Sequence, residues 1–132
     1  MKGKGALIYV VDDDLFICEL VKKTLTQKGF KVETFPYGEE CLKVLADKRP
    51  DLIVLDYLFV KPHSEVMNGK EIFRRIREIY EDLPVVMLSG QDSGGAVLEL
   101  ARLGINDYII KDQSLAENLL TAIGDILEIE EE

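Results

Sequence analysis

Short runs of β-branched and other apolar residues alternate with longer segments of helical periodicity five times along the chain. Three of these runs are almost continuously apolar, which is typical of parallel strands buried on both faces. Strand and helix units joined by short links predict an α/β domain with a doubly wound parallel sheet and right-handed crossovers. The predicted strands are residues 6–11, 30–35, 51–57, 84–89 and 106–110.

The segments between the strands have the apolar spacing of amphipathic helices. Gly29 is expected to end the first helix. Asn68 with Glu71, and Ser114 with Glu117, have the spacing of a helix cap and its partner. Residues 39–47 and 93–103 have a weaker pattern that is compatible with helices. The stripes predicted to face the core are Phe16, Ile17, Leu20, Val21 and Leu25 in the first helix, Ile72, Phe73, Ile76 and Ile79 in the third, and Leu115, Leu119, Ile123 and Leu127 in the fifth.

The length of 132 residues predicts a single domain over residues 1–132, in which residues 113–132 leave no room for an output domain. The net charge of −9 disfavours direct binding to nucleic acid or to an anionic membrane. We find neither a membrane-spanning run nor a signal peptide and expect a cytoplasmic protein. Cys18 and Cys41 lie on apolar helix sides, where packing is expected rather than a disulfide or a metal site.

Charged and polar residues follow four of the predicted strands. Three aspartates, residues 12–14, follow the first strand, Asp56 lies near the end of the third, Ser89 ends the fourth and Lys111 follows the fifth. Ligands of doubly wound sheets bind at the carboxyl ends of the strands. These side chains are therefore expected to converge.

The converging groups predict a metal-assisted phosphoryl site. Two carboxylates about 4 Å apart repel by about 4 kcal/mol at an effective dielectric constant near 20, so a cation is expected among them. Clustered carboxylate oxygens suit Mg²⁺. A carboxylate beside the metal can attack phosphorus and form an acyl phosphate, while Lys111 and Ser89 stabilise its oxygens. Asp14 is expected to cap the first helix.

Five motifs then point to a known family. They are "VVDDD", "DLIVLDY", "NGKEIFRRIRE", "PVVMLSG" and "NDYIIKD", in this order and at nearly the family's spacing. With them the chain resembles, over almost its full length, the receiver domain of two-component response regulators, of the stand-alone CheY-like kind. The resemblance implies a flavodoxin-like sheet with strand order 2-1-3-4-5, flanked by five helices.

The resemblance also implies a role for each site residue. Its assignments are Asp13 as direct Mg²⁺ ligand, Asp12 as an acid acting largely through water, Asp56 as phosphoacceptor, the main-chain carbonyl of Leu58 as a further metal ligand, Ser89 as switch hydroxyl, Lys111 as phosphate-binding lysine, and Tyr108 as the aromatic whose rotamer follows Ser89. A half-buried strand aromatic without a switch role is the alternative for Tyr108.

By the same resemblance, a sensor histidine kinase or a histidine phosphotransfer protein would phosphorylate Asp56. The chain would be no enzyme beyond transfer to its own Asp56 and loss of that phosphoryl group. The surface of the fourth helix, fifth strand and fifth helix would then change its affinity for a downstream protein. A monomer or weak dimer is expected.

Two features depart from the family's pattern. In residues 57–69 the glycine that opens the third helix comes about five residues later than usual. A tolerated surface insertion explains this as well as a role in partner choice or in access to Asp56 does. His63 within this segment is expected to be solvated. Asp112 stands where a proline normally follows the lysine through a cis bond. Either a strained cis bond is retained there or the loop is rearranged.

Three other functions compete with the switch. A Mg²⁺-dependent phosphatase would need a second acid and a substrate cap, neither of which is visible. A flavodoxin-like cofactor binder would need a hydroxyl- and glycine-rich loop where residues 12–14 are aspartates. A scaffold that is never phosphorylated is the third. The basic residues Arg74, Arg75 and Arg77 are interpreted as a solvated helix face.

Overall fold

The computed structural model describes residues 5–57, 69–90 and 101–128. Within them, five parallel strands form one sheet in the order β2-β1-β3-β4-β5, which confirms the predicted topology. Residues 101–103 are the described end of a further helix. The other elements are β1 (Leu7–Val11), α1 (Leu15–Gln27), β2 (Lys31–Phe35), α2 (Gly38–Leu45), β3 (Leu52–Asp56), α3 (Gly69–Ile79), β4 (Val85–Ser89), β5 (Asp107–Ile110) and α5 (Leu115–Leu127).

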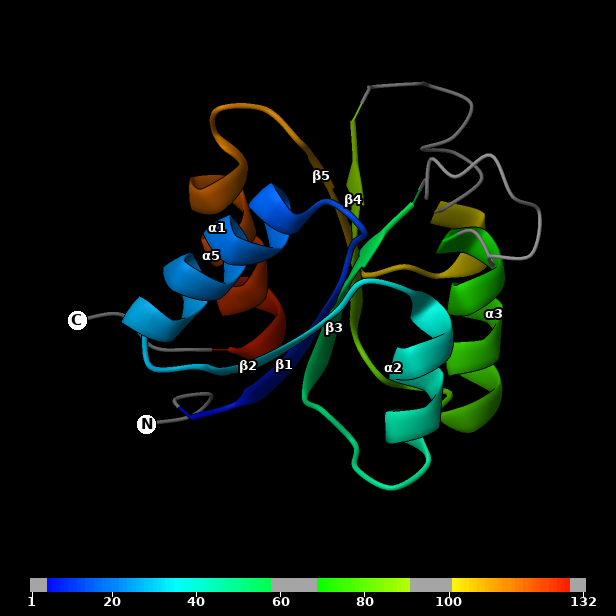
Figure 1. Ribbon diagram of the computed structural model, residues 1–132. Helices are drawn as coiled ribbons and strands as arrows, with labels where there is room; N and C mark the ends of the chain where they lie inside the picture. Colours follow the sequence, from blue (N-terminus) through cyan, green and yellow to red (C-terminus); the bar gives the residue numbers. More distant parts are fainter. Residues whose placement is uncertain (1–4, 58–68, 91–100, 129–132) are drawn as a thin grey trace.

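The sheet is covered on both faces, with α1 and α5 on one side and α2 and α3 on the other (Figure 1). Alternate residues of β1 enter two separate cores. Ile8 and Val10 pack with α1 and α5, whereas Tyr9 and Val11 pack with α2 and α3. Every residue of β3 and β4 is buried, as expected for nearly continuous apolar runs in the centre of a parallel sheet.

Both predicted ends of α1 are confirmed. Asp14 Oδ1 accepts hydrogen bonds from the backbone N–H groups of Phe16 at 2.9 Å and Ile17 at 3.4 Å. At the other end Gly29 has a φ of +94°, a conformation that glycine adopts without steric cost. The Phe30 N–H donates to the carbonyl of Leu25 at 3.2 Å and closes the helix.

Three details of the predicted helices are wrong. Phe16 is 72% exposed and Ile79 is 41% exposed, because periodicity identifies the apolar side of a helix but not how far its end extends past the layer it covers. Ser114 precedes α5, but its side chain makes no cap hydrogen bond. The carbonyl of Asp112 instead accepts from the Leu115 N–H at 3.0 Å. Asn68 lies outside the described residues.

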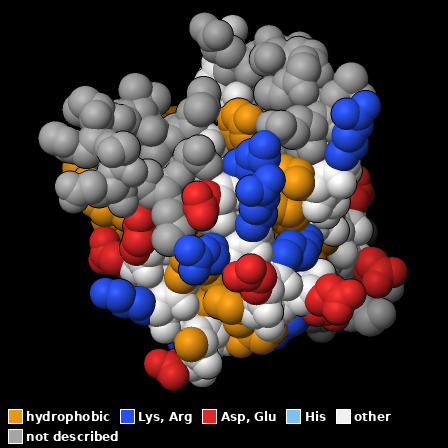
Figure 2. Space-filling view, turned by 90° about the vertical axis from the view of Figure 1, so that its right-hand side faces the viewer, with side chains coloured by type: hydrophobic (Ala, Val, Ile, Leu, Met, Phe, Trp, Pro, Cys, Tyr) orange, Lys and Arg blue, Asp and Glu red, His pale blue; other side chains and the backbone are white. Residues whose placement is uncertain are grey.

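Basic side chains gather on the side of the molecule that carries α3 (Figure 2). Arg74 and Arg75 are exposed, as predicted. Arg77 differs, since it lies over the Phe73 ring at 4.7 Å and donates to the carbonyl of Leu83. Burial lowers the pKa of Arg77, an effect that Asp82 partly offsets. Arg77 is therefore a structural residue rather than part of a solvated face.

Cys18 and Cys41 are both buried and unpaired, which confirms their predicted packing role. Among the described helices, none combines the length and the apolar character needed to cross a bilayer.

Candidate functional site

The carboxyl ends of β1, β3, β4 and β5 meet at one edge of the sheet, and strand register fixes what lies there. Val11 is paired with Leu55, Asp56 with Leu88, and Ser89 with Ile110. Lys111 extends the last pairing, because its N–H donates to the carbonyl of Ser89 at 2.7 Å. The predicted convergence of the strand ends is therefore observed.

Three carboxylates form the centre of this site. Asp12, Asp13 and Asp56 each offer one oxygen, and these oxygens all lie within 4.8 Å of one another. Asp12 is fully buried and Asp56 is 2% exposed, whereas Asp13 is partly exposed. The Asp14 side chain instead caps α1. The three consecutive aspartates thus divide into a buried acid, a half-exposed acid and a helix cap.

Lys111 supplies the positive charge at this cluster. Its Nζ lies 2.7 Å from Asp12 Oδ2 and 3.2 Å from Asp56 Oδ1, and its side chain is 17% exposed. Burial alone would lower the pKa of Lys111, but the Asp12 and Asp56 carboxylates outweigh burial and raise it. The ammonium form is therefore the one held in the site.

In the described part of this cluster, three acids face a single lysine. Burial raises the pKa of Asp12, an effect that Lys111 and the N–H of Asp14 only partly offset. Although Lys111 Nζ is close to Asp12 Oδ2, no donor among the described residues completes a well-aligned hydrogen bond to this buried oxygen. A buried carboxylate oxygen with spare lone pairs, beside two further carboxylates, suits a hard divalent cation. The donor set can therefore bind a metal such as Mg²⁺.

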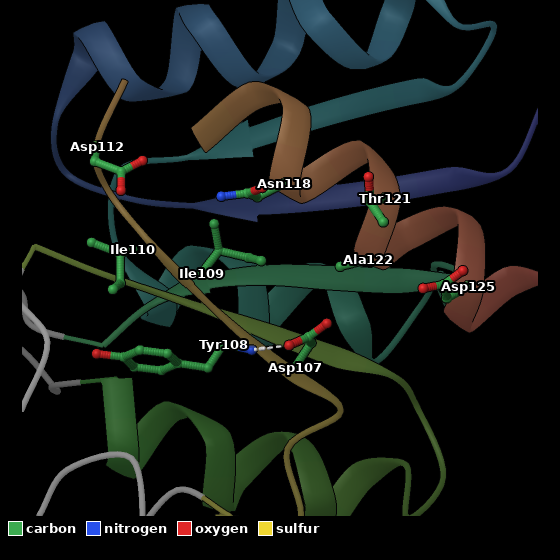
Figure 3. A pocket seen from close by; sticks show the side chains of 9 residues that line it. All are labelled: Asp107, Tyr108, Ile109, Ile110, Asp112, Asn118, Thr121, Ala122 and Asp125. Carbon is green, nitrogen blue, oxygen red and sulfur yellow. Dashed lines mark hydrogen bonds between the residues drawn. The ribbon is translucent and has the colours of Figure 1, made fainter. Parts of the chain in front are cut away.

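Ser89 and Tyr108 flank the acidic centre on β4 and β5. Ser89 is 4% exposed at the end of its strand. Tyr108 is half-buried and packs against the core on the α2 and α3 side. Its ring projects from the opposite side of β5 to Ile109, which packs toward α5 (Figure 3). Tyr108 has the burial expected of a strand aromatic, and its switch role stays a prediction.

Asp112 is accommodated by a rearranged loop. The described residues contain no cis peptide bond, so the alternative of a retained cis bond between Lys111 and Asp112 is wrong. Asp112 Oδ1 accepts from the Ser114 N–H at 2.8 Å. Lys111 nevertheless reaches both carboxylates. Leu58 and His63 lie outside the described residues.

Sequence reasoning missed two residues that support the site. An added Cβ on Gly69 would lie 2.3 Å from the carbonyl oxygen of Asp56, so α3 begins directly against the backbone of the site. Cys18 Sγ donates to the carbonyl of Asp12 at 3.1 Å. The glycine that opens α3 was a usable signal, because a glycine at a helix start permits close approach of another backbone. Nothing in the sequence indicated the thiol contact.

Comparison with known proteins agrees with this geometry. The sequence profile of the response regulator receiver domain family matches residues 8–123. Response regulator MprA of Mycobacterium sp. (strain KMS) is 34% identical over 112 residues, which cover 85% of this chain and 46% of MprA. A second MprA, from Mycobacterium avium (strain 104), is also 34% identical, with 85% and 47% covered. The chain thus spans about half the length of the curated relatives it matches.

Two solved structures have the same fold. The chemotaxis response regulator CheY4 of Vibrio cholerae superimposes with a TM-score of 0.80 at 30% identity, covering 92% of this chain and 98% of CheY4. The response regulator DrrB of Thermotoga maritima, an OmpR/PhoB homolog, gives a TM-score of 0.79 at 32% identity, covering 93% of this chain and 52% of DrrB. The similarity therefore extends over nearly all of this chain.

Proposed function

The chain belongs to the response regulator receiver domain family, and on this premise we propose that it is a phosphorylation-dependent switch whose phosphoacceptor is Asp56. The observation that carries the proposal is the contact of one partly buried lysine with two buried carboxylates. Lys111 Nζ lies 2.7 Å from Asp12 and 3.2 Å from Asp56, beside the half-exposed Asp13. Receiver domains act in two-component systems, and their partners there include histidine kinases.

Asp56 is the nucleophile of the proposed reaction. One of its carboxylate oxygens attacks the phosphorus of a phosphohistidine on a sensor histidine kinase or a phosphotransfer protein. The O–P bond forms as the P–N bond breaks, and the imidazole leaves with the electron pair. Lys111 Nζ lies 3.2 Å from Asp56 Oδ1 before the reaction. As the phosphoryl group is transferred, the ammonium contacts the new phosphoryl oxygens and stabilises their negative charge. The hydroxyl of Ser89 donates a hydrogen bond to one of these oxygens.

Asp12, Asp13 and Asp56, with the main-chain carbonyl of Leu58, would hold Mg²⁺. The metal supplies neutralisation of the phosphoryl charge when it is bound. Asp12 and Asp13 lie beside Asp56 and contribute oxygens to the metal without reacting themselves. Lys111 holds Asp12 in place through their contact of 2.7 Å. Asp56 therefore both binds the metal and accepts the phosphoryl group, whereas Asp12 and Asp13 serve the metal alone.

The output is a change in protein binding. Lys111 and Ser89 lie at the ends of neighbouring strands joined by a backbone hydrogen bond of 2.7 Å, so both respond to one phosphoryl group. Tyr108, three residues before Lys111, turns inward when Ser89 moves. The surface that includes β5 and α5 then changes its affinity for a downstream protein.

Intact-mass analysis after incubation with acetyl phosphate, with and without Mg²⁺, tests the proposal. The wild type is expected to gain one phosphoryl group only with Mg²⁺, and Asp56→Asn is expected to gain none. Asp47→Asn, which changes an exposed aspartate, is the matched control and should react like the wild type. An adduct on Asp56→Asn, or none on the wild type, would refute the assignment. Sustained turnover of phosphomonoesters would instead favour a phosphatase.

A further inference from the structure

A groove follows the outer edge of the sheet. β5 is the last strand of the sheet, and a cavity of about 340 Å³ lies between it and α5 (Figure 3). Ile109 and Ala122 are buried and form its apolar floor. Asn118 and Thr121 add exposed polar groups from α5. The groove is thus a concave, partly apolar surface beside a strand that has a partner strand on one side only among the described residues.

The charged residues that line this groove are all acidic. Asp107, Asp112 and Asp125 line it and are exposed, and the lining contains no lysine or arginine. Figure 3 places Asp112 at one end and Asp107 and Asp125 toward the other. Exposed acids alone are ordinary on a chain with net charge −9. These three surround one hollow, however, and no described cation forms an ion pair with any of them.

The charges next to the groove do not neutralise it. Residues 115–127, which form α5, include no lysine or arginine. Lys111 precedes Asp112 but points into the phosphorylation site, where it contacts Asp12 and Asp56. Asp107 and Asp112 each use one carboxylate oxygen for a nearby backbone N–H and retain the other for a ligand.

We propose that this groove docks a segment of a partner protein that carries lysine or arginine side chains flanked by apolar ones. The proposal rests on the proposed switch function and specifies the chemistry of the downstream partner. Cationic side chains would meet the three aspartates, and an apolar side chain would cover Ile109 and Ala122. A second copy of this chain is disfavoured, because a two-fold interface brings the same acidic surface against itself.

The groove is connected to the phosphorylation site through β5. Tyr108 belongs to the strand that borders the groove, although its ring projects from the opposite side of β5. Asp112 follows Lys111 directly in the chain. The N–H of Lys111 donates to the carbonyl of Ser89 at 2.7 Å, so displacement of either residue moves the rim. Phosphorylation of Asp56 therefore changes the spacing of the aspartates that receive the cationic segment.

The test uses a labelled peptide of alternating arginine and leucine, with fluorescence anisotropy for affinity and amide chemical shifts for location. The groove variant is Asp107→Asn/Asp112→Asn/Asp125→Asn. A control variant with the same change in charge alters three exposed acids elsewhere, Glu40→Gln/Asp47→Asn/Glu81→Gln. Asparagine at 112 keeps an oxygen for the Ser114 N–H, so the fold of the loop is retained.

The groove variant is expected to lose about tenfold or more in affinity, whereas the control loses less than about twofold, because only close charge pairs hold the peptide specifically. Shifts should centre on Ile109, Asn118 and Ala122. Equal losses in both variants would mean unspecific attraction and would overturn the proposal. Concentration-dependent shifts at the groove without peptide would identify a second copy as the occupant and overturn it as well.

Acetyl phosphate is added to the same samples, and intact mass reports the state of Asp56 separately. A peptide affinity that is unchanged when Asp56 carries the phosphoryl group would overturn the link between groove and switch. Failure of Asp56 to accept the group would refute the proposed function and appear in the mass spectrum, whatever the peptide does. The two failures are therefore distinguishable.

Discussion

Removal of the Lys111 ammonium is the sharpest test of the electrostatics of the site. At an effective dielectric constant near 20, contacts of 2.7 Å and 3.2 Å to two carboxylates correspond to roughly 6 and 5 kcal/mol of attraction. Desolvation of the buried charges cancels much of this gain. Loss of one member of a buried pair typically costs about 3–5 kcal/mol, because the other member remains charged and buried. Lys111→Met is therefore expected to destabilise the metal-free protein by about 3–5 kcal/mol.

Urea unfolding at pH 7.5 in EDTA measures this loss. Lys48→Met is the matched control, because Lys48 Nζ also lies 3.3 Å from a carboxylate oxygen of Glu33, but the two side chains are 60% and 42% exposed. An exposed pair contributes at most about 1 kcal/mol. Mg²⁺ should reduce the stability difference between Lys111→Met and the wild type, since a divalent cation can replace the missing charge at the acidic cluster. The difference between Lys48→Met and the wild type should stay the same with and without Mg²⁺, because both proteins keep the cluster intact.

A second substitution separates charge from packing. If unbalanced charge causes the loss, Asp12→Asn should recover stability in the Lys111→Met background, because one of the two buried carboxylates is then neutral. If the loss came from packing of the lysine stem, Asp12→Asn would restore nothing. A loss no larger than that of Lys48→Met would refute the reasoning itself.

Further predictions concern the packing around the site. Gly69→Ala should destabilise the protein by about 1–3 kcal/mol in urea unfolding, because the added Cβ would lie 2.3 Å from the carbonyl oxygen of Asp56. Gly124→Ala, in open space on α5, should instead stabilise the protein by up to about 1 kcal/mol. Equal effects of the two substitutions would contradict this. Burial raises the pKa of Cys41 to about 12, so its thiol should resist a disulfide reagent in the native state. Because the unfolded thiol ionises first, stability should fall as pH rises from about 9 toward 12; a pH-independent stability there would count against it. Arg77→Met should cost about 1–3 kcal/mol by leaving carbonyls unpaired, unlike an exposed arginine substitution, which should stay within about 0.5 kcal/mol.

The sheet and the meeting of the strand ends were predictable from the sequence. Almost continuously apolar runs that alternate with amphipathic helices indicate buried parallel strands. Parallel strands place all their carboxyl ends at one edge of the sheet. Asp12, Asp56 and Lys111 therefore converge because each directly ends or follows a strand. The strand order came from the resemblance to receiver domains, since no residue pattern specifies which buried strands are neighbours.

What the sequence could not predict depends on distances between elements that lie far apart in the chain. The contact of Gly69 with the carbonyl of Asp56 involves two backbones thirteen positions apart, and the hydrogen bond of Arg77 to Gly104 spans a still longer separation. The pattern of charges along α3 gives Arg75 and Arg77 the same predicted environment, yet Arg77 is half-buried and Arg75 is exposed. Helix periodicity likewise could not show that Phe16 lies beyond the layer it was expected to cover.

Asp112 shows how a departure from the family's pattern can be compatible with the site. The position of the Lys111 side chain depends on the backbone hydrogen bond of Lys111 to Ser89 at 2.7 Å and on its contacts with Asp12 and Asp56. None of these interactions involves Asp112. Asp112 instead organises the start of α5, where its side chain and carbonyl accept from two successive N–H groups. The substitution leaves the lysine in place and adds a carboxylate to the rim of the β5 and α5 groove. Under the proposed docking role, Asp112 changes the charge that the groove presents to a partner, while Lys111 keeps its contacts with Asp12 and Asp56.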